Sequence, residues 1–197
     1  MKRGTILAAA VLLGVTACRA DYIQDIVNRV RLDSYTAFLD NQLHAHDGDN
    51  RGYGAAHDAA QTDIYNTFAS LGLTASRDPF TYSGSTYYNV TGIRPGAVNP
   101  NTYVIVGAHY DSVNNPGADD DASGVAGVLE AARVLSNYSF ANTLVFVAFD
   151  REEQGLIGSA AWAAAHASAA IAGMLELDMI AYNPGGVNTA RLYTVSG

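Results

Sequence analysis

The stretch TYVIVGAHY, residues 102–110, decides the fold class of this chain. It is a nearly continuous apolar run that follows the turn-forming residues Asn99, Pro100 and Asn101. A strand with apolar side chains on both faces must be covered on both faces, as the central strands of a parallel sheet are. We therefore predict that these residues form a strand in the interior of an α/β sheet.

The residues that follow alternate between helical and extended patterns. Residues 124–135 (GVAGVLEAARVL) keep apolar side chains on one helical face, and residues 143–149 (TLVFVAF) form a second apolar run. Residues 158–167 (GSAAWAAAHA) are helix-like again, and residues 171–179 (IAGMLELDM) form a third strand-like run. Strands that alternate with helices indicate βαβ crossovers. The predicted fold is a three-layer αβα domain with a mostly parallel, twisted central sheet.

On the N-terminal side of these units the pattern is first helical and then extended. Apolar residues keep helical spacing from residue 23 to 43 and again from 60 to 71, where Gly72 stops the helix. Residues 79–83 (PFTYS) and 87–95 (YYNVTGIRP) alternate like strands. We predict a mostly helical N-terminal region that leads into two strands.

The first residues, MKRGTILAAAVLLGVTAC, are typical of an export signal, because two basic residues precede an uncharged run from Gly4 to Ala17. The segment VTAC at 15–18 is typical of a bacterial lipobox, in which cleavage before Cys18 leaves a cysteine to be lipidated. The alternative is an ordinary signal peptide with an incidental cysteine. We predict a lipoprotein-type signal at 1–17 and an exported domain at 18–197. This domain would be anchored in the cell envelope, periplasmic or at the cell surface, or otherwise secreted.

Composition excludes several classes of protein. The chain has 197 residues, 49% of them hydrophobic, which suits one domain with a full core. Its formal net charge of −8 argues against nucleic acid as a partner. Cys18 is the only cysteine, which excludes an internal disulfide and a thiolate metal cluster. Any metal must therefore be bound by His, Asp and Glu.

Charged residues gather at the carboxyl ends of the three predicted core strands. HYD at 109–111 closes the first strand, DREE at 150–153 the second and LD at 177–178 the third, while ADDD at 118–121 leads into the helix after the first strand. In an open α/β sheet those ends line one crevice. Carboxylates gathered there would repel one another unless a cation held them. The pattern predicts a metal site.

Four ordered motifs resemble the zinc aminopeptidases of peptidase family M28. They are GAHYDS (107–112), PGADDDASGVAGVLEAARVL (116–135), AFDREEQGLIGS (148–159) and LELDM (175–179). The segment GYGAAHDAAQTDIYNTFASLGL (52–73) is also similar to an N-terminal helix of the family. The resemblance runs from about residue 22 to 197 and implies the phosphorylase/hydrolase-like fold of zinc exopeptidases.

The resemblance implies a role for each matching residue. His109, Asp120 and Asp178 would bind a first zinc ion. Asp120 would also bridge to a second zinc ion, which Glu153 would bind as well. Glu152 corresponds to the general base of the family. The complete family site holds two Zn²⁺ ions.

The resemblance also implies supporting roles around these ligands. Asp111 would orient the imidazole of His109, since a metal-binding histidine usually donates its other N–H to a carboxylate. Asp119 and Asp121 would be supporting residues, with a cis peptide between Asp120 and Asp121. Asp121 or Ser123 is also suited to cap the helix that follows. Two further residues have less defined places: Glu176, interpreted as supporting or solvent-facing, and Asp150, which is left without a role.

The implied activity is hydrolysis of a peptide bond by a metal-bound water, with release of N-terminal amino acids. The expected partners are peptides with a free N-terminus, without nucleic acid, and with membrane contact only through the lipid anchor. The sequence contains neither G-x-S-x-G nor H-E-x-x-H, the signatures of two other hydrolase mechanisms.

One departure from the family concerns the second zinc ion, which takes a histidine near the end of the family domain. No histidine follows Asp178 in this sequence, and the domain is expected to be incomplete at its C-terminus. The remaining histidines, His44, His46, His57 and His166, are not expected to replace it. We expect one zinc to be held well. Two alternatives stay open: an inactive fragment or metal- or peptide-binding remnant of the fold, and a glutaminyl cyclase-like enzyme. HYDS together with Glu-Glu favours the peptidase.

Overall fold

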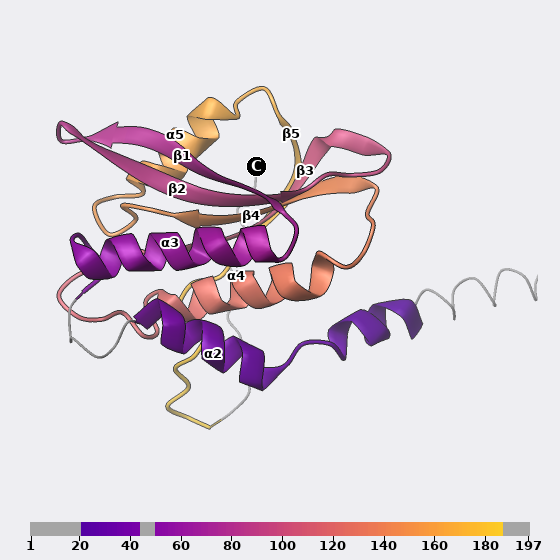
Figure 1. Ribbon diagram of the computed structural model, residues 1–197, viewed down its shortest axis with the longest axis horizontal. Helices are drawn as coiled ribbons and strands as arrows, with labels where there is room; N and C mark the ends of the chain where they lie inside the picture. Colours follow the sequence, from indigo (N-terminus) through magenta and orange to yellow (C-terminus); the bar gives the residue numbers. More distant parts are fainter. Residues whose placement is uncertain (1–20, 44–49, 187–197) are drawn as a thin grey trace, which may run out of the picture.

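The computed structural model describes residues 21–43 and 50–186 (Figure 1). Residues 21–27 are helical, and the elements that follow are α2 (Leu32–Leu43), α3 (Ala55–Ser70), β1 (Thr74–Tyr82), β2 (Ser85–Arg94), β3 (Asn99–His109), α4 (Ala122–Leu135), β4 (Asn142–Phe149), α5 (Ile157–Ala165) and β5 (Ala170–Glu176). This order confirms the helical N-terminal region and the alternation of strands and helices after it. The expected signal peptide and lipobox, residues 1–18, lie outside the described residues.

The strands form one sheet in the order β1-β2-β4-β3-β5. Strand β3 is parallel to both β4 and β5, whereas β2 is antiparallel to both β1 and β4. The described sheet is therefore mixed, and its parallel part is limited to β3, β4 and β5. The cause is the tight turn at Ser83 and Gly84, both with positive φ, which joins β1 to β2 as a hairpin and leaves no room for a crossover.

Helices cover both faces of the sheet, which confirms the predicted αβα layers (Figure 1). Helices α3 and α4 pack on one face, α2 packs on α4, and α5 covers the other face. Strand β4 lies in the middle, since Leu144, Phe146 and Ala148 belong to the core on the α3 and α4 side. Val145, Val147 and Phe149 pack on the α5 side with Trp162. This double burial explains the continuous apolar run of residues 143–149.

Strand β5 is an edge of the described sheet and is exposed along its whole length. Ile171, Met174 and Leu175 are each about half exposed. A long apolar edge strand is a place where another strand can pair. Within the described part of the chain, no helix is long and apolar enough to cross a lipid bilayer.

Candidate metal centre

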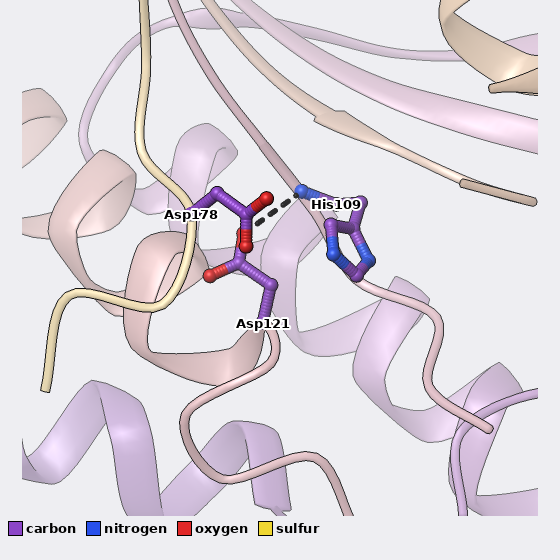
Figure 2. Close-up of side chains that lie close together, drawn as sticks. All are labelled: His109, Asp121 and Asp178. Carbon is purple, nitrogen blue, oxygen red and sulfur yellow. Dashed lines mark hydrogen bonds between the residues drawn. The ribbon is translucent and has the colours of Figure 1, made fainter. Parts of the chain in front are cut away.

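The carboxyl ends of the three parallel strands bring the predicted site residues together. Strand β3 ends at His109, the segment after β5 carries Asp178, and the turn before α4 carries Asp121. One ligand atom from each of these three residues lies within 4.8 Å of the other two. Figure 2 shows the carboxylates of Asp121 and Asp178 side by side at the end of β3. This convergence is the one expected at the carboxyl edge of parallel strands.

His109 is buried and oriented by two contacts on opposite sides of its ring. Its Nδ1 lies 3.1 Å from the backbone oxygen of Asp111 and 3.5 Å from Oδ1 of the same residue. Its Nε2 lies 3.1 Å from Oδ1 of Asp120 and 3.9 Å from Oε2 of Glu152. A proton on Nδ1 satisfies the Asp111 oxygens and leaves the lone pair of Nε2 directed at the carboxylates. The backbone oxygen of Asp111, more than its carboxylate, is thus the nearer orienting partner.

The carboxylate of Asp111 positions the two adjacent glutamates. Its Oδ1 accepts the backbone N–H of Glu152 at 3.0 Å, and its Oδ2 accepts that of Glu153 at 3.3 Å. Asp111 is fully buried, and two amide donors together with the nearby imidazole compensate its charge. One aspartate therefore links the histidine at the end of β3 to the loop after β4.

The three consecutive aspartates point in different directions. Of the two residues suited to cap α4, Asp121 does so by accepting the N–H of Gly124 at 2.8 Å. It also accepts the N–H of His109 at 3.2 Å and of Met179 at 3.3 Å. Oδ1 of Asp119 accepts the amides of Ala181 and Tyr182 at 2.8 and 2.9 Å. The supporting roles expected for Asp119 and Asp121 match these contacts, because both hold the segment that follows Asp178.

Asp120 differs from its two neighbours because its side chain is 46% exposed and faces Nε2 of His109. The peptide bond between Asp120 and Asp121 is cis, as the resemblance implies. Asp121 lies close enough to His109 and Asp178 to be counted with them. Its two oxygens, however, already accept three backbone N–H groups. Asp120 therefore stays the predicted ligand, with Asp121 as its predicted support.

Helix α4 approaches the segment after β5 very closely at Gly124. A Cβ atom there would overlap the carbonyl oxygen of Leu177 and both carboxylate oxygens of Asp121. The N–H of Ile180 also donates to Oγ of Ser123 at 2.9 Å. The place of Asp178 thus depends on the absence of a side chain at residue 124.

The pKa values of the site residues indicate that a cation would be bound favourably there. Burial would lower the pKa of His109, but the neighbouring carboxylates, chiefly Asp111 and Asp121, outweigh it and raise this pKa to about 9. Burial raises the pKa of Asp121 to about 8, although His109 and the Gly124 amide oppose the rise. Burial also raises the pKa of Glu152 and Glu153, and nearby carboxylates add to the effect. A cation beside these groups would keep the carboxylates ionised and displace the imidazole proton.

The donor set fits zinc. An imidazole nitrogen and carboxylate oxygens are ordinary zinc ligands, and the fixed Nδ1 contact of His109 is the outer support that such a ligand needs. Although Glu176 is exposed as a residue, partial desolvation of its carboxyl group raises its pKa, with Asp178 and Glu152 adding to the rise and His109 opposing it. Glu176 therefore lies within the electrostatic reach of the site.

Arg51 supports the loops beside the site, a role that the sequence did not predict. Arg51 is fully buried, and its guanidinium donates to the backbone oxygens of Tyr110, Pro116 and Gly117 on both sides of the site. Burial lowers the pKa of Arg51 to about 10, although the nearby aspartates raise it in part. In the sequence, the feature that could have pointed to Arg51 is its charge beside the neutral segment Gly-Tyr-Gly at 52–54. Its partners follow only from the fold.

Two of the four histidines that were not expected to bind the second zinc ion, His57 and His166, lie in the described part of the chain. His57 on α3 is buried against Asp150, with Nε2 3.1 Å from both carboxylate oxygens. Burial would lower the pKa of His57, but Asp150 and Asp58 raise it overall. His166, at the end of α5 and not in the middle of a helix, stacks on Trp162 with ring centroids 3.9 Å apart. His44 and His46 lie outside the described residues.

Fold and site together define an α/β protein with an imidazole and several carboxylates converging on a divalent-cation site. The sequence model of peptidase family M28 matches residues 89–195, which is more than half of the chain and contains all four strand-end motifs. The chain belongs to peptidase family M28.

Individual relatives agree with this assignment. A probable zinc metalloprotease of Pyrenophora tritici-repentis is 44% identical over 96 residues, 43% of this chain and 22% of the relative. Leupeptin-inactivating enzyme 1 of Streptomyces exfoliatus is 38% identical over 149 residues, 72% of this chain and 34% of the relative. Leucine aminopeptidase 1 of Ajellomyces capsulatus is 36% identical over 124 residues, 55% of this chain and 32% of the relative. This chain therefore spans about a third or less of the length of these relatives.

The fold is shared with solved structures. LapB from Legionella pneumophila superposes with a TM-score of 0.71 at 21% identity, over 84% of this chain and 48% of that protein. At this level of identity the likeness concerns the fold alone.

Proposed function

We propose that the chain carries the catalytic site of a metal-dependent exopeptidase that removes N-terminal amino acids from peptides. The observation that carries the proposal is the position of Nε2 of His109, which faces Asp120 at 3.1 Å and Glu152 at 3.9 Å. A metal ligand and a carboxylate able to move a proton are thus on the same side of one imidazole. Relatives named zinc metalloprotease and leucine aminopeptidase support the same reaction.

The residues that would hold zinc come from three strand ends. His109, Asp120 and Asp178 would bind one ion, and Asp120 and Glu153 a second. Zinc bound there would lower the pKa of a water molecule and polarise the scissile carbonyl. Asp111 keeps Nε2 of His109 available, because its oxygens occupy the Nδ1 side of the ring.

Glu152 is the residue placed to move protons. Its backbone N–H is held by Asp111, so its carboxylate has a defined starting point near His109. Burial raises the pKa of Glu152, and a base whose pKa lies closer to neutrality transfers protons in both directions more readily. Oε2 of Glu152 would take a proton from the attacking water and then donate it to the leaving amine.

The substrate is proposed to be a peptide with a free α-amino group. Carboxylates dominate the site, and the chain has a formal net charge of −8, so a cationic N-terminus is attracted and a free C-terminal carboxylate is repelled. This favours cleavage at the N-terminal end. We also propose that the protein is exported and held at a membrane through a lipid on Cys18, which leaves peptides outside the cytoplasm as its substrates.

The test is the substitution Glu152→Gln in the 197-residue chain and, if its reading frame extends further, in the longer product. Zinc-loaded protein is assayed on a leucine anilide, on free and N-acetylated peptides, and on a peptide with N-terminal glutamine. We expect release of the N-terminal residue from free peptides only, and a fall in kcat of about 100-fold or more in the variant with zinc content unchanged.

The matched control is Glu176→Gln, which changes another carboxyl at the same sheet edge and should keep turnover within a few-fold of the wild-type rate. Near-normal turnover of the Glu152→Gln protein would remove Glu152 from the proton-transfer role. Cyclisation of the glutaminyl peptide without release of amino acids would instead favour a cyclase. Zinc binding without any turnover would favour a metal-binding remnant.

A further inference from the structure

We propose that His57, acting through Asp150, is a positioning residue for the loop that carries Glu152 and Glu153. This loop, residues 150–158, is called the glutamate loop below. The proposal rests on the proposed function, because it gives His57 a task in the reaction of that site. Nothing in the motif pattern assigns either His57 or Asp150.

The glutamate loop is closed at its base by hydrogen bonds. The N–H of Gly158 donates to the oxygen of Asp150 at 3.0 Å, and the N–H of Ile157 to the oxygen of Arg151 at 3.0 Å. Asn89 on β2 clamps the same base, with Oδ1 accepting the N–H of Asp150 at 3.0 Å and Nδ2 donating to the oxygen of Gly158 at 2.8 Å. The loop can therefore move only as far as this base and its side-chain contacts allow.

Asp150 connects that base to α3. Its carboxylate is fully buried, and Nε2 of His57 lies 3.1 Å from each of its two oxygens. Oδ1 of Asp150 also accepts the N–H of Arg151 at 2.9 Å. Arg151 has a φ of 60°, a conformation that a non-glycine residue rarely adopts without support. The Asp150 carboxylate supplies this support, immediately before Glu152.

His57 itself is held rigidly. It lies in the first turn of α3, whose Ala60, Ile64 and Phe68 are fully buried in the core. Its ring also lies 5.2 Å from that of Tyr110, next to His109 in sequence. A contact anchored on such a helix fixes a loop more firmly than a contact between two loops does.

The glutamate loop is thus held from two sides. Asp111 accepts the N–H groups of Glu152 and Glu153 from the side of the metal site. Asp150 holds the N–H of Arg151 from the side of α3. Loss of the His57 contact would leave the buried Asp150 carboxylate with Arg151 Nε, at 3.6 Å, as its charged neighbour, and the carboxylate would shift. The support of the Arg151 N–H would weaken, and Asp111 would then be the main side-chain acceptor beside Glu152. Displacement of a catalytic group by about 1 Å can cost on the order of 100-fold in rate.

The experiment measures amide hydrogen exchange residue by residue in the chain and in two variants, His57→Leu and His57→Gln. In His57→Leu we expect the protection of the Arg151, Glu152 and Glu153 amides to fall by about tenfold or more, the scale of one lost buried hydrogen bond. The amides of β4 should keep their protection. Glutamine can still donate to Asp150, so His57→Gln should recover most of the loss.

The control is His166→Leu, which removes the histidine that stacks on Trp162 and should leave the glutamate loop unchanged. A uniform loss of protection in the loop and in β4 would mean that His57 only stabilises the fold, and unchanged loop amides would also overturn the proposal. If His57→Leu does not fold, His57→Gln decides alone, since wild-type protection in the loop together with wild-type kcat is expected for it.

Kinetics separate this proposal from the proposed function. In zinc-loaded protein, His57→Leu should lower kcat by about tenfold or more while KM changes little, because the substrate contacts are not altered. A wild-type protein without turnover would contradict the exopeptidase proposal but leave the exchange result intact. Selective loss of loop protection with unchanged kcat in an active protein would refute a positioning role.

Discussion

The substitution Gly124→Ala tests the proposed place of Asp178 without touching any metal ligand. A methyl group at this position would overlap the carbonyl oxygen of Leu177 and the carboxylate of Asp121, so either the chain after β5 or the cap of α4 must move. The matched control is Gly127→Ala, one turn further along α4. There the new Cβ would lie 2.8 Å from Cδ1 of Leu177 and 3.1 Å from Cδ1 of Ile180, which are ends of flexible side chains.

The two substitutions should have opposite effects on stability. Alanine is favoured over glycine inside a helix by about 1 kcal/mol, a gain that both variants receive. Gly127→Ala should therefore range from neutral to about 1 kcal/mol more stable. Gly124→Ala must also push a carbonyl and a buried carboxylate aside, and overpacking of this kind costs about 1–3 kcal/mol or more. We expect a net loss of about 1–3 kcal/mol and a fall in Tm of roughly 3–10 °C.

The same displacement should weaken metal binding. Disturbing the residues that support metal ligands typically costs about 10- to 100-fold in affinity, and we expect this range for Gly124→Ala. The assays are urea unfolding in a chelator and zinc titration against a chromophoric competitor. If both variants show the same stability and bind zinc as the wild type does, α4 does not determine the place of Asp178, and the structural reasoning fails.

Three further predictions concern protons, zinc and the N-terminus. The folded pKa of His109 is about 9 against an ordinary value of 6.5, so its contribution to the stability of the metal-free chain is complete below pH 6.5 and disappears as pH rises through about 9. Unfolding in a chelator should show this decline, and zinc binding should tighten over the same range because zinc displaces the proton. This 197-residue chain should retain about one zinc after dialysis and a second only weakly, because Asp120 and Glu153 alone are proposed to hold the second ion and two carboxylates bind zinc poorly; two equivalents found by metal analysis would refute this. Mass spectrometry of membrane fractions should find a lipidated Cys18, and a soluble form that begins after Cys18 would indicate an ordinary secreted protein.

Much of the fold follows from local sequence patterns. The three parallel strands, the helices between them and the cap of α4 depend on side chains only a few residues apart. The strands and helices lie within three residues of their predicted bounds, and Asp121, one of the two expected caps, caps α4. The sequence also predicts that His109, Asp178 and the aspartates before α4 converge, because parallel strands place their carboxyl ends at one edge; the structure brings Asp121 together with His109 and Asp178 there. The ligand roles of the individual residues stay predictions.

Contacts between distant segments had to come from the tertiary structure. The hairpin of β1 and β2 inserts β2 beside β4 and makes the sheet mixed, which no periodicity within one strand can indicate. His57 and Asp150 are 93 residues apart, and Arg51 lies 59 residues from Tyr110, so these pairs exist only after α3 and the strands have packed.

The three consecutive aspartates show the same division. The sequence by itself determined that Asp119, Asp120 and Asp121 stand at the start of a helix, at the end of the sheet where a cation would be needed. Their individual tasks depend on which amides surround each carboxylate. Segment 177–182 supplies amides to Asp119 and Asp121, while Asp120 is turned toward His109. Adjacent residues of identical chemistry differ in role because a buried carboxylate must find donors, and only the packed chain determines where those donors lie.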